Sequence, residues 1–120
     1  MDNYIRSLDM KAIVGAKLEV DSFIELYNQG GVILLDVRYA FEHKTWGLPF
    51  SVNIPLNELP DRLSELPKDK IIVCACPEVC RSNIARQYLA INGYDSKILV
   101  PGLLKLLERL KGGRSNDLKL

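Results

Sequence analysis

The sequence has almost no excess of charge of either sign. Its 16 lysine and arginine residues nearly balance its 15 aspartate and glutamate residues, which leaves a formal net charge of +1. Surfaces that bind nucleic acid, and segments that bind anionic membranes, carry a clear excess of positive charge. We therefore expect neither nucleic acid nor a membrane among the partners of this protein.

Long apolar segments are also absent. The longest apolar runs, near residues 32–35 and 71–76, are far shorter than the roughly 18 residues that a membrane-spanning helix needs. The N-terminal stretch has acidic side chains and no apolar run of the length found in signal peptides. We therefore expect a cytoplasmic protein. With 120 residues, the chain is long enough for one compact domain and too short for two of ordinary size.

Cysteine and histidine are scarce. The three cysteines all lie between Cys74 and Cys80, and the only histidine, His43, belongs to another segment. Secreted disulfide-bonded domains have an even number of cysteines, and a zinc site usually takes two separated pairs of ligands. The sequence therefore predicts no metal ion, and thiols gathered at one point of the chain favour redox or sulfur chemistry.

The segment from residue 71 to residue 89 has the pattern of a strand, a tight loop and a helix. Residues 71–73 are apolar and β-branched and follow a polar stretch, as expected of a buried central strand. From Ser82 onward the apolar residues recur at helical spacing. The residues predicted to share one face of this helix are Ile84, Ala85, Tyr88 and Leu89.

The loop of this segment begins with a thiol and ends with a guanidinium. The first turn of a helix has unpaired N–H groups and the positive end of the helix dipole, and both stabilise an anion. We therefore expect the backbone N–H groups from Glu78 to Ser82 to surround the sulfur of Cys76, which should ionise more readily than a free thiol. The same donors could bind an anionic substrate group or a terminal persulfide. The loop residues are Cys76, Pro77, Glu78, Val79, Cys80 and Arg81, and Ser82 follows them.

The order of a strand, Cys-x-x-x-x-Arg-Ser and a helix resembles the single-domain rhodaneses, a family of sulfurtransferases. Other segments resemble that family in the expected order, so the resemblance covers roughly residues 18 to 110. These segments are residues 34–38 with Glu42, residues 52–56, residues 59–66, residues 92–94 and residues 97–99. The chain departs from the family pattern at Trp46–Ser51, at Val79, where glycine is common, and at Pro101-Gly102, where a Gly-Gly pair is usual near the last helix.

Strands and helices alternate along the chain, which predicts an α/β fold with a largely parallel sheet. We interpret it as a rhodanese-like, doubly wound domain, with five strands and with helices on both faces of the sheet. The predicted strands are near residues 12–19, 32–35, 52–54, 71–73 and 97–100. The domain is expected to span residues 12–111, between an N-terminal extension of residues 1–11 and a disordered tail of residues 112–120.

Local sequence patterns predict where the other helices begin. Ser22 and Glu25 resemble a capping box, and Asn57 is expected to cap a helix that has Pro60 in its first turn. A short helix is expected within residues 39–46. The last helix is predicted to have one apolar face made of Leu103, Leu106, Leu107 and Leu110.

Charged side chains follow the strand at residues 32–35. In open α/β sheets, ligands bind at the carboxyl ends of the strands, which is where Asp36 and Arg38 would lie. We expect these two residues to brace the loop after the central strand or to pair with Glu42. His43 has no evident partner in the sequence and is interpreted as a surface residue.

The resemblance implies a sulfurtransferase in which Cys76 is the nucleophile. Its thiolate would take the sulfane sulfur of thiosulfate, of a polysulfide or of a protein persulfide, and the Cys76 persulfide would pass that sulfur to a thiol or to cyanide. This chemistry requires no cofactor. Glu78 should repel the thiosulfate dianion, so we expect weak activity with thiosulfate. A small domain of this kind is expected to exchange sulfur with a donor or acceptor protein.

Two other interpretations remain open. Cys80 could be a resolving thiol that forms a disulfide with Cys76, as in a dithiol redox enzyme or an arsenate-reductase-type enzyme. The chain could also be a non-catalytic binding module with a rhodanese fold. The loop from Cys76 to Arg81 has six residues, a length that the resemblance associates with sulfur rather than with phosphate or arsenate. Cys74 precedes Cys76 by two residues and is expected to pack in the core.

Overall fold

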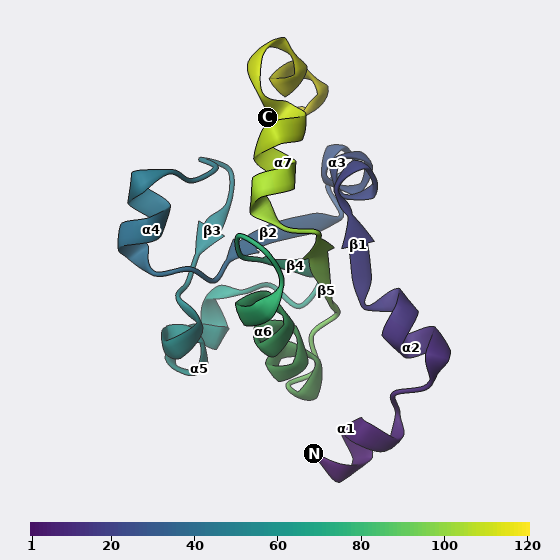
Figure 1. Ribbon diagram of the computed structural model, residues 1–120. Helices are drawn as coiled ribbons and strands as arrows, with labels where there is room; N and C mark the ends of the chain where they lie inside the picture. Colours follow the sequence, from purple (N-terminus) through teal and green to yellow (C-terminus); the bar gives the residue numbers. More distant parts are fainter.

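The computed structural model of the protein describes all 120 residues and contains one five-stranded sheet. Neighbouring strands are all parallel, in the order β1-β5-β4-β2-β3 (Figure 1). The predicted α/β fold with a parallel five-stranded sheet is therefore confirmed. The strands are β1 (Lys17–Glu19), β2 (Val32–Asp36), β3 (Val52–Asn53), β4 (Ile71–Ala75) and β5 (Ser96–Val100).

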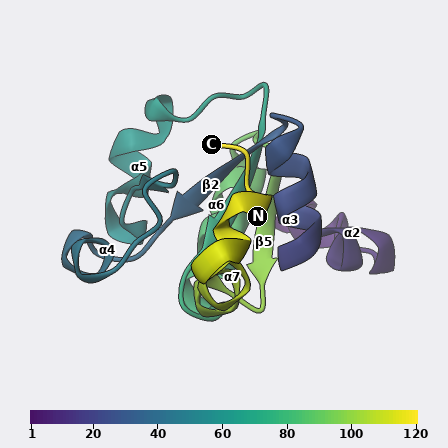
Figure 2. The same ribbon diagram turned by 90° about the horizontal axis from the view of Figure 1, so that it is seen from above.

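Seven α-helices accompany the strands. They are α1 (Asp2–Arg6), α2 (Met10–Gly15), α3 (Val20–Asn28), α4 (Ala40–Thr45), α5 (Leu59–Arg62), α6 (Cys80–Ile91) and α7 (Leu103–Leu110). Short 3-10 helices are formed by Leu56–Glu58, Leu63–Glu65 and Gly112–Asp117. None of the helices has both the length and the apolar character that crossing a membrane requires. Seen from above in Figure 2, α3 and α7 lie next to each other, while α4 and α5 lie at the other end of the sheet from α2.

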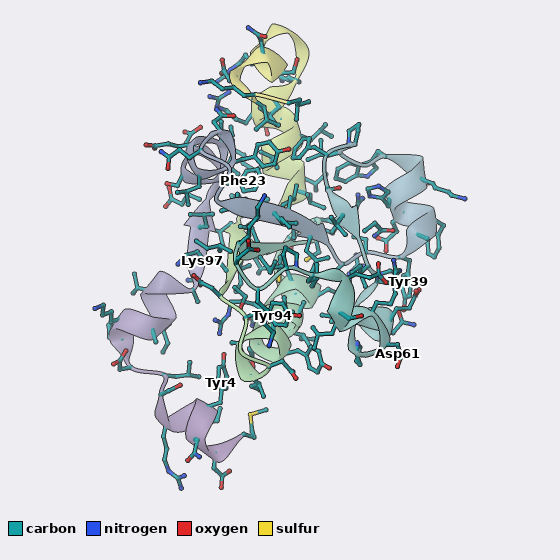
Figure 3. The ribbon with its side chains drawn as sticks, turned by 180° about the vertical axis from the view of Figure 1, so that it is seen from behind. Tyr4, Phe23, Tyr39, Asp61, Tyr94 and Lys97 are labelled. Atoms are coloured by element: carbon teal, nitrogen blue, oxygen red, sulfur yellow. The ribbon has the colours of Figure 1, made fainter.

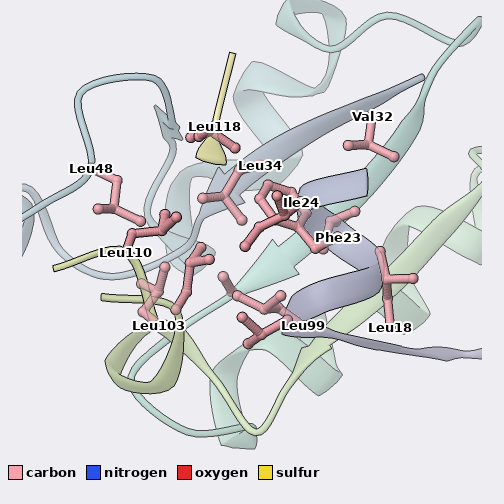
Figure 4. Packing of buried hydrophobic residues seen from close by; sticks show 14 residues of the cluster. Leu18, Phe23, Ile24, Val32, Leu34, Leu48, Leu99, Leu103, Leu110 and Leu118 are labelled. Carbon is pink, nitrogen blue, oxygen red and sulfur yellow. The ribbon is translucent and has the colours of Figure 1, made fainter. Parts of the chain in front are cut away.

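One face of the sheet is covered by α3 and α7. Phe23 of α3 packs with Leu34 of β2 and Leu99 of β5, and all three side chains are fully buried (Figure 4). Leu106 of α7 belongs to the same cluster and is fully buried as well. Burial of a side chain of this size contributes about 1.5–3 kcal/mol. This cluster therefore accounts for a large part of the stability of the domain.

The other face is covered by α5 and α6. Leu59 and Leu89 of these helices pack with Leu35 of β2 in a second cluster. Cys74 and Cys76 belong to this second cluster too, because alternate residues of a strand point to the same face of the sheet. The Cys76 side chain therefore lies on the α6 side of the sheet, just beyond the end of β4.

The first two helices form an arm, residues 1–15, which extends away from the sheet (Figure 1). Neither helix has a buried residue. The strand predicted near residues 12–19 is wrong in its first half, since residues 12–15 belong to α2 and only Lys17–Glu19 form β1. Asp9 caps α2 by accepting a hydrogen bond from the backbone N–H of Ala12 at 2.8 Å. That cap favours a helix over the strand that the branched side chains suggest.

The C-terminal segment folds against the domain, which corrects the predicted disordered tail of residues 112–120. Leu118 is buried in the cluster under α3 and α7. The side chain of Asn28 donates a hydrogen bond to the Asp117 carbonyl at 2.9 Å and accepts one from the Lys119 backbone N–H at 2.8 Å. Arg109 of α7 also pairs with Asp117 at 2.9 Å, so one apolar side chain, two hydrogen bonds and an ion pair hold the segment in place.

Two predicted helix starts are also corrected. α3 begins at Val20, whose side chain is buried, so Ser22 and Glu25 lie inside the helix and form no capping box. Asn57 lies in the 3-10 helix before α5 and its side chain caps no helix. In both places the chain turns into a helix a few residues earlier than the polar side chains indicate.

The buried faces of α6 and α7 are narrower than predicted. In α6 the buried residues are Ser82, Ala85 and Leu89, whereas Ile84 is exposed. In α7, Leu107 is likewise exposed. The buried serine in α6 points to a local role other than apolar packing.

Candidate active site

The loop between β4 and α6 places the Cys76 sulfur at the N-terminus of a helix. The backbone N–H of Ser82, in the first turn of α6, donates a hydrogen bond to Cys76 Sγ at 3.4 Å. An N–H at this point has no partner within its own helix, so the sulfur satisfies it. The Ser82 hydroxyl lies 3.4 Å from the same sulfur and donates a hydrogen bond to the Val79 carbonyl at 3.2 Å. The sulfur therefore lies at the positive end of the α6 dipole.

The ring of N–H groups predicted around this sulfur is not formed. Of the backbone amides from Glu78 to Ser82, only that of Ser82 donates a hydrogen bond to Cys76 Sγ. The Glu78 carbonyl faces the sulfur at 3.3 Å and can accept the hydrogen of the thiol. Val79, at the position where the resemblance expects glycine, has a φ of −130° and needs no left-handed conformation. Cys76 is about 2% exposed, so its loop encloses it.

Gly102 allows the backbone before α7 to approach the loop closely. Its φ is +143°, in the region that favours glycine, and a Cβ there would meet the Glu78 carbonyl oxygen at 2.7 Å and the Pro77 carbonyl oxygen at a still shorter distance. Leu103, the next residue, donates its backbone N–H to the Cys76 carbonyl at 2.9 Å. The start of α7 therefore fixes the backbone of the loop.

Arg81 is joined to Glu42 by two hydrogen bonds, and we call this ion pair the clasp. Arg81 Nη1 lies 2.6 Å from Glu42 Oε1, and Arg81 Nη2 lies 3.0 Å from Glu42 Oε2. The Tyr39 backbone N–H also donates to Glu42, at 3.0 Å. The hydrogen bonds from Arg81 lower the pKa of Glu42 to about 2, and those to Glu42 raise the pKa of Arg81. The clasp therefore connects α4 to the loop.

A second ion pair is completely buried. Asp36 and Arg38 are each 1% exposed, and Arg38 Nη2 lies 2.8 Å from Asp36 Oδ2. Burial alone would raise the pKa of Asp36, but hydrogen bonds from Arg38 and His43 outweigh it, so that pKa is lowered. Arg38 also donates to the Trp46 carbonyl at 2.8 Å, and its guanidinium lies 4.0 Å from the centre of the Trp46 ring. Asp36 and Arg38 thus pair with each other, and neither forms the predicted ion pair with Glu42.

Three residues that support this buried pair are missed by the sequence reasoning. His43 Nδ1 lies 2.9 Å from Asp36 Oδ2, which corrects the surface role expected for His43. Asn53 donates to the carbonyls of Asp36 and Arg38, both at 3.0 Å. A Cβ at Gly47 would meet the His43 carbonyl oxygen at 2.6 Å and His43 Nδ1 at 2.7 Å, so glycine leaves room for both the backbone and the imidazole of His43. Among these three residues, only Asn53 has a signal in the sequence: it is an amide within the short strand predicted at residues 52–54.

A pocket of about 420 Å³ opens beside Arg81. It lies on the Cys76 side of the sheet, because its wall residue Val37 belongs to the same apolar cluster as Cys76. Tyr39 (labelled in Figure 3) stacks on Phe41 with ring centres 5.5 Å apart, and both rings are exposed. The pocket therefore offers apolar walls and a guanidinium that is already paired. Its lining residues are Val37, Tyr39, Leu56, Asn57 and Arg81.

The three cysteines have different surroundings. Cys74 is fully buried, and this burial raises the pKa of its thiol to about 12, as suits a core residue. Cys80 is the exposed first residue of α6. No disulfide joins any two of the cysteines, and Cys80 makes no hydrogen bond with Cys76. The resolving role of Cys80 therefore stays a hypothesis.

The fold and the site define an α/β domain that holds a cysteine between the central strand of a parallel sheet and the first turn of a helix. The model of the Rhodanese-like domain family matches residues 19–108 of the 120. The chain belongs to this family.

Known relatives and solved structures agree with the family. The chain is 36% identical over 71 residues to a sulfurtransferase of Allochromatium vinosum, which covers 59% of this chain and 66% of that protein. It matches a rhodanese-related protein of Thermoplasma volcanium with a TM-score of 0.68 and 28% identity, over 78% of this chain and 91% of that one. A single-domain sulfurtransferase of Saccharomyces cerevisiae has the same fold, with a TM-score of 0.67 and 22% identity over 85% of this chain and 94% of that one. The chain spans 66% or less of the length of the curated relatives that it matches.

Proposed function

We propose that this protein is a sulfurtransferase that carries sulfane sulfur as a persulfide on Cys76. One observation carries the proposal: in a chain of the rhodanese-like family, the Cys76 sulfur lies at the N-terminus of α6 and accepts a hydrogen bond from the Ser82 backbone N–H. The names of two relatives, both sulfurtransferases, support the activity. The three free thiols suit a reducing compartment, so we place the activity in the cytoplasm.

The first half-reaction loads the enzyme. The Cys76 thiolate attacks the outer, sulfane sulfur of the donor, and a new S–S bond forms. The bond between that sulfur and the rest of the donor breaks, and its electron pair leaves with the donor, as sulfite from thiosulfate or as a shorter chain from polysulfide. The product is a Cys76 persulfide that carries the negative charge.

The second half-reaction transfers the outer sulfur of the Cys76 persulfide to an acceptor. A thiolate or cyanide attacks the outer sulfur of the persulfide, the S–S bond of the persulfide breaks, and its electron pair returns to Cys76. The acceptor leaves as a persulfide or as thiocyanate. Sulfur atoms and charge balance over the two steps, so the cycle requires no cofactor and no external oxidant or reductant.

A negative sulfur in this loop needs hydrogen-bond donors. The Ser82 amide and the positive end of α6 already face the sulfur, and the Ser82 hydroxyl, which now donates to the Val79 carbonyl, lies close enough to turn toward it. The Glu78 carbonyl faces it as well and would repel a negative charge. Rotation of the peptide between Glu78 and Val79 would exchange this carbonyl for the Val79 N–H. We include this rotation in the proposed cycle.

The charges around the loop favour a polysulfide or a protein persulfide over thiosulfate as donor. The Arg81 guanidinium is already bound by Glu42, and Glu78 adds a carboxylate that forms no ion pair. A dianion therefore meets no free guanidinium in the pocket beside Arg81, whereas the apolar walls of that pocket, which Tyr39 lines, can receive an organic group. We propose that a protein or small-molecule thiol is the acceptor in the cell.

Intact-mass spectrometry after incubation with polysulfide tests the proposal. The unmodified protein and the Cys80→Ser variant should both gain the mass of one sulfur atom, and the Cys76→Ser variant should gain none. Cys80→Ser is the matched control because it removes the other thiol of the same loop. Absence of the gain in the unmodified protein would leave a non-catalytic binding module as the better interpretation.

The same variants test the dithiol alternative. A resolving Cys80 would attack the inner sulfur of the Cys76 persulfide, form a disulfide and release hydrosulfide. Cys80→Ser would then accumulate the persulfide and lose turnover. Full sulfur transfer by Cys80→Ser would exclude the resolving role.

A further inference from the structure

A cavity of about 580 Å³ adjoins the loop on its β5 side, whereas the pocket beside Arg81 adjoins it on the β2 side. Its walls include Glu78 and Val79 of the loop, Asn83 of α6 and Val100 of β5. Small-molecule sites in proteins typically measure about 300–1,000 Å³. The cavity is therefore large enough for an organic ligand of moderate size.

A second cavity of about 280 Å³ continues the first toward the N-terminal arm. The two cavities share Lys17, Asn83 and Ile98, and we call them together the arm groove. Tyr4 and Leu8 of the arm form part of its far wall. Figure 3 labels Tyr4 on the arm. The family match begins at residue 19, so the arm groove is built partly from residues outside the matched domain.

Two cations line the arm groove without a carboxylate partner. Neither Lys17 nor Arg86 takes part in an ion pair. The Arg86 guanidinium donates from Nη2 to the Tyr4 hydroxyl, but its buried Nε has no hydrogen-bond partner. A buried donor without a partner costs about 1–3 kcal/mol. Glu78, the only carboxylate of the groove, belongs to the loop end and not to the cavity that Arg86 lines.

The rest of the arm groove is mainly apolar. An anionic group near Lys17 and Arg86 would gain two positive partners, and an apolar chain could lie along Ile98 and Val100. We propose that the arm groove binds an organic anion of this kind, a carboxylate attached to an extended apolar chain. The larger apolar side chains of the lining are Leu8, Ile13, Val79, Ile98, Val100 and Pro101.

A ligand in the arm groove would contact the loop that encloses Cys76. Glu78 and Val79 line the groove, and the Glu78 carbonyl faces the Cys76 sulfur. Two kinds of ligand have the required anionic group and apolar chain. One is an acceptor thiol whose anionic end is held in the groove, and the other is an effector without a thiol that changes the conformation of the loop.

Hexanoate and 1-hexanol are suitable probes, because they share the chain and differ in charge. Binding is followed by NMR shifts of the methyl groups of Ile98, Val79 and Val100. Hexanoate should bind at least about tenfold more tightly than hexanol, and Lys17→Met should remove most of that difference. Lys111→Met is the matched control, since Lys111 is exposed, forms no ion pair and lies at the end of α7. Equal binding of the two probes, or equal effects of the two lysine variants, would overturn the proposal.

A second pair of probes separates the two kinds of ligand. If the groove holds the acceptor, 6-mercaptohexanoate should have a lower KM than 6-mercaptohexanol in sulfur transfer, and Lys17→Met should equalise them. If the ligand is an effector, hexanoate should change the rate without competing with either thiol. Lys17→Met should still gain sulfur on Cys76, so failure of the groove proposal is distinguishable from failure of the sulfur-carrier proposal.

Discussion

Two ion pairs near the loop have the same chemistry and differ in burial. Asp36 and Arg38 are each 1% exposed, whereas the side chains of Glu42 and Arg81 in the clasp are 26% and 32% exposed. Removing one partner of a buried pair costs about 3–5 kcal/mol, because the other charge is left unpaired. An exposed pair contributes only about 0–1 kcal/mol. We therefore expect the first pair to control folding and the clasp to control the loop.

Arg38→Met should have the largest effect. It leaves the Asp36 carboxylate buried with only His43 as a side-chain partner, so the free energy of unfolding should fall by about 3–5 kcal/mol in urea denaturation. Adding Asp36→Asn to Arg38→Met should recover part of the loss, because the unpaired charge is then gone. A loss below about 1 kcal/mol would show that the burial of the pair does not decide its contribution.

His43→Ala should have an intermediate effect. It removes one hydrogen bond to a buried carboxylate, for which about 1.5–3 kcal/mol of stability is expected. Gly47→Ala should act in the same direction, since its Cβ would meet the His43 carbonyl oxygen at 2.6 Å and the imidazole Nδ1 at 2.7 Å. Thermal unfolding of both variants measures the effect, and unchanged midpoints would contradict the supporting role assigned to His43.

Glu42→Gln should change stability by no more than about 1 kcal/mol but should alter substrate preference. Freeing the Arg81 guanidinium gives an anionic donor a cation beside the loop, so kcat/KM for thiosulfate relative to polysulfide should rise roughly three- to tenfold. Glu58→Gln breaks a comparable exposed pair with Arg62 and is the control. The clasp would have no part in substrate preference if both variants kept the original ratio.

The smallest expected effect is the loss of the clasp's contribution to stability at acidic pH. The pKa of Glu42 is about 2 in the folded protein, below its ordinary value of 4.5. The folded state therefore binds fewer protons than the unfolded state in this range, and the stability from the clasp is present above pH 4.5 and is lost as the pH falls toward 2. The difference in melting temperature between the unmodified protein and Glu42→Gln should shrink over that interval. A constant difference would contradict this origin.

The sequence predicts the fold well because local patterns determine it. The apolar run of residues 71–73 marks β4, and the change to helical spacing marks α6. The carboxyl end of β2 brings Asp36 and Arg38 near the loop after β4, because β2 and β4 are neighbours in the sheet. These inferences need only periodicity and the geometry of parallel strands.

Partners far apart in the chain could not be predicted in this way. Glu42 and Arg81 are separated by 39 residues, and only packing of α4 beside the loop reveals that they pair. The orientation of the Glu78 carbonyl toward Cys76 cannot be predicted from the sequence either, because it depends on one peptide torsion and not on side-chain type. Asp9 is a cap residue that the sequence does show, but the β-branched residues that follow it favour a strand at residues 12–15, where the structure has α2.

The contact between Gly102 and the loop has a consequence for how such a domain can change. Two backbone segments of the chain are in contact there with no side chain between them. The shape of the turn that contains Cys76 therefore depends on a residue 26 positions further along the sequence. A single added methyl group at that point would spread the two segments apart. The geometry around the cysteine therefore depends on residue 102 having no side chain, and substitutions at Gly102 should not be tolerated even though glycine has no functional group.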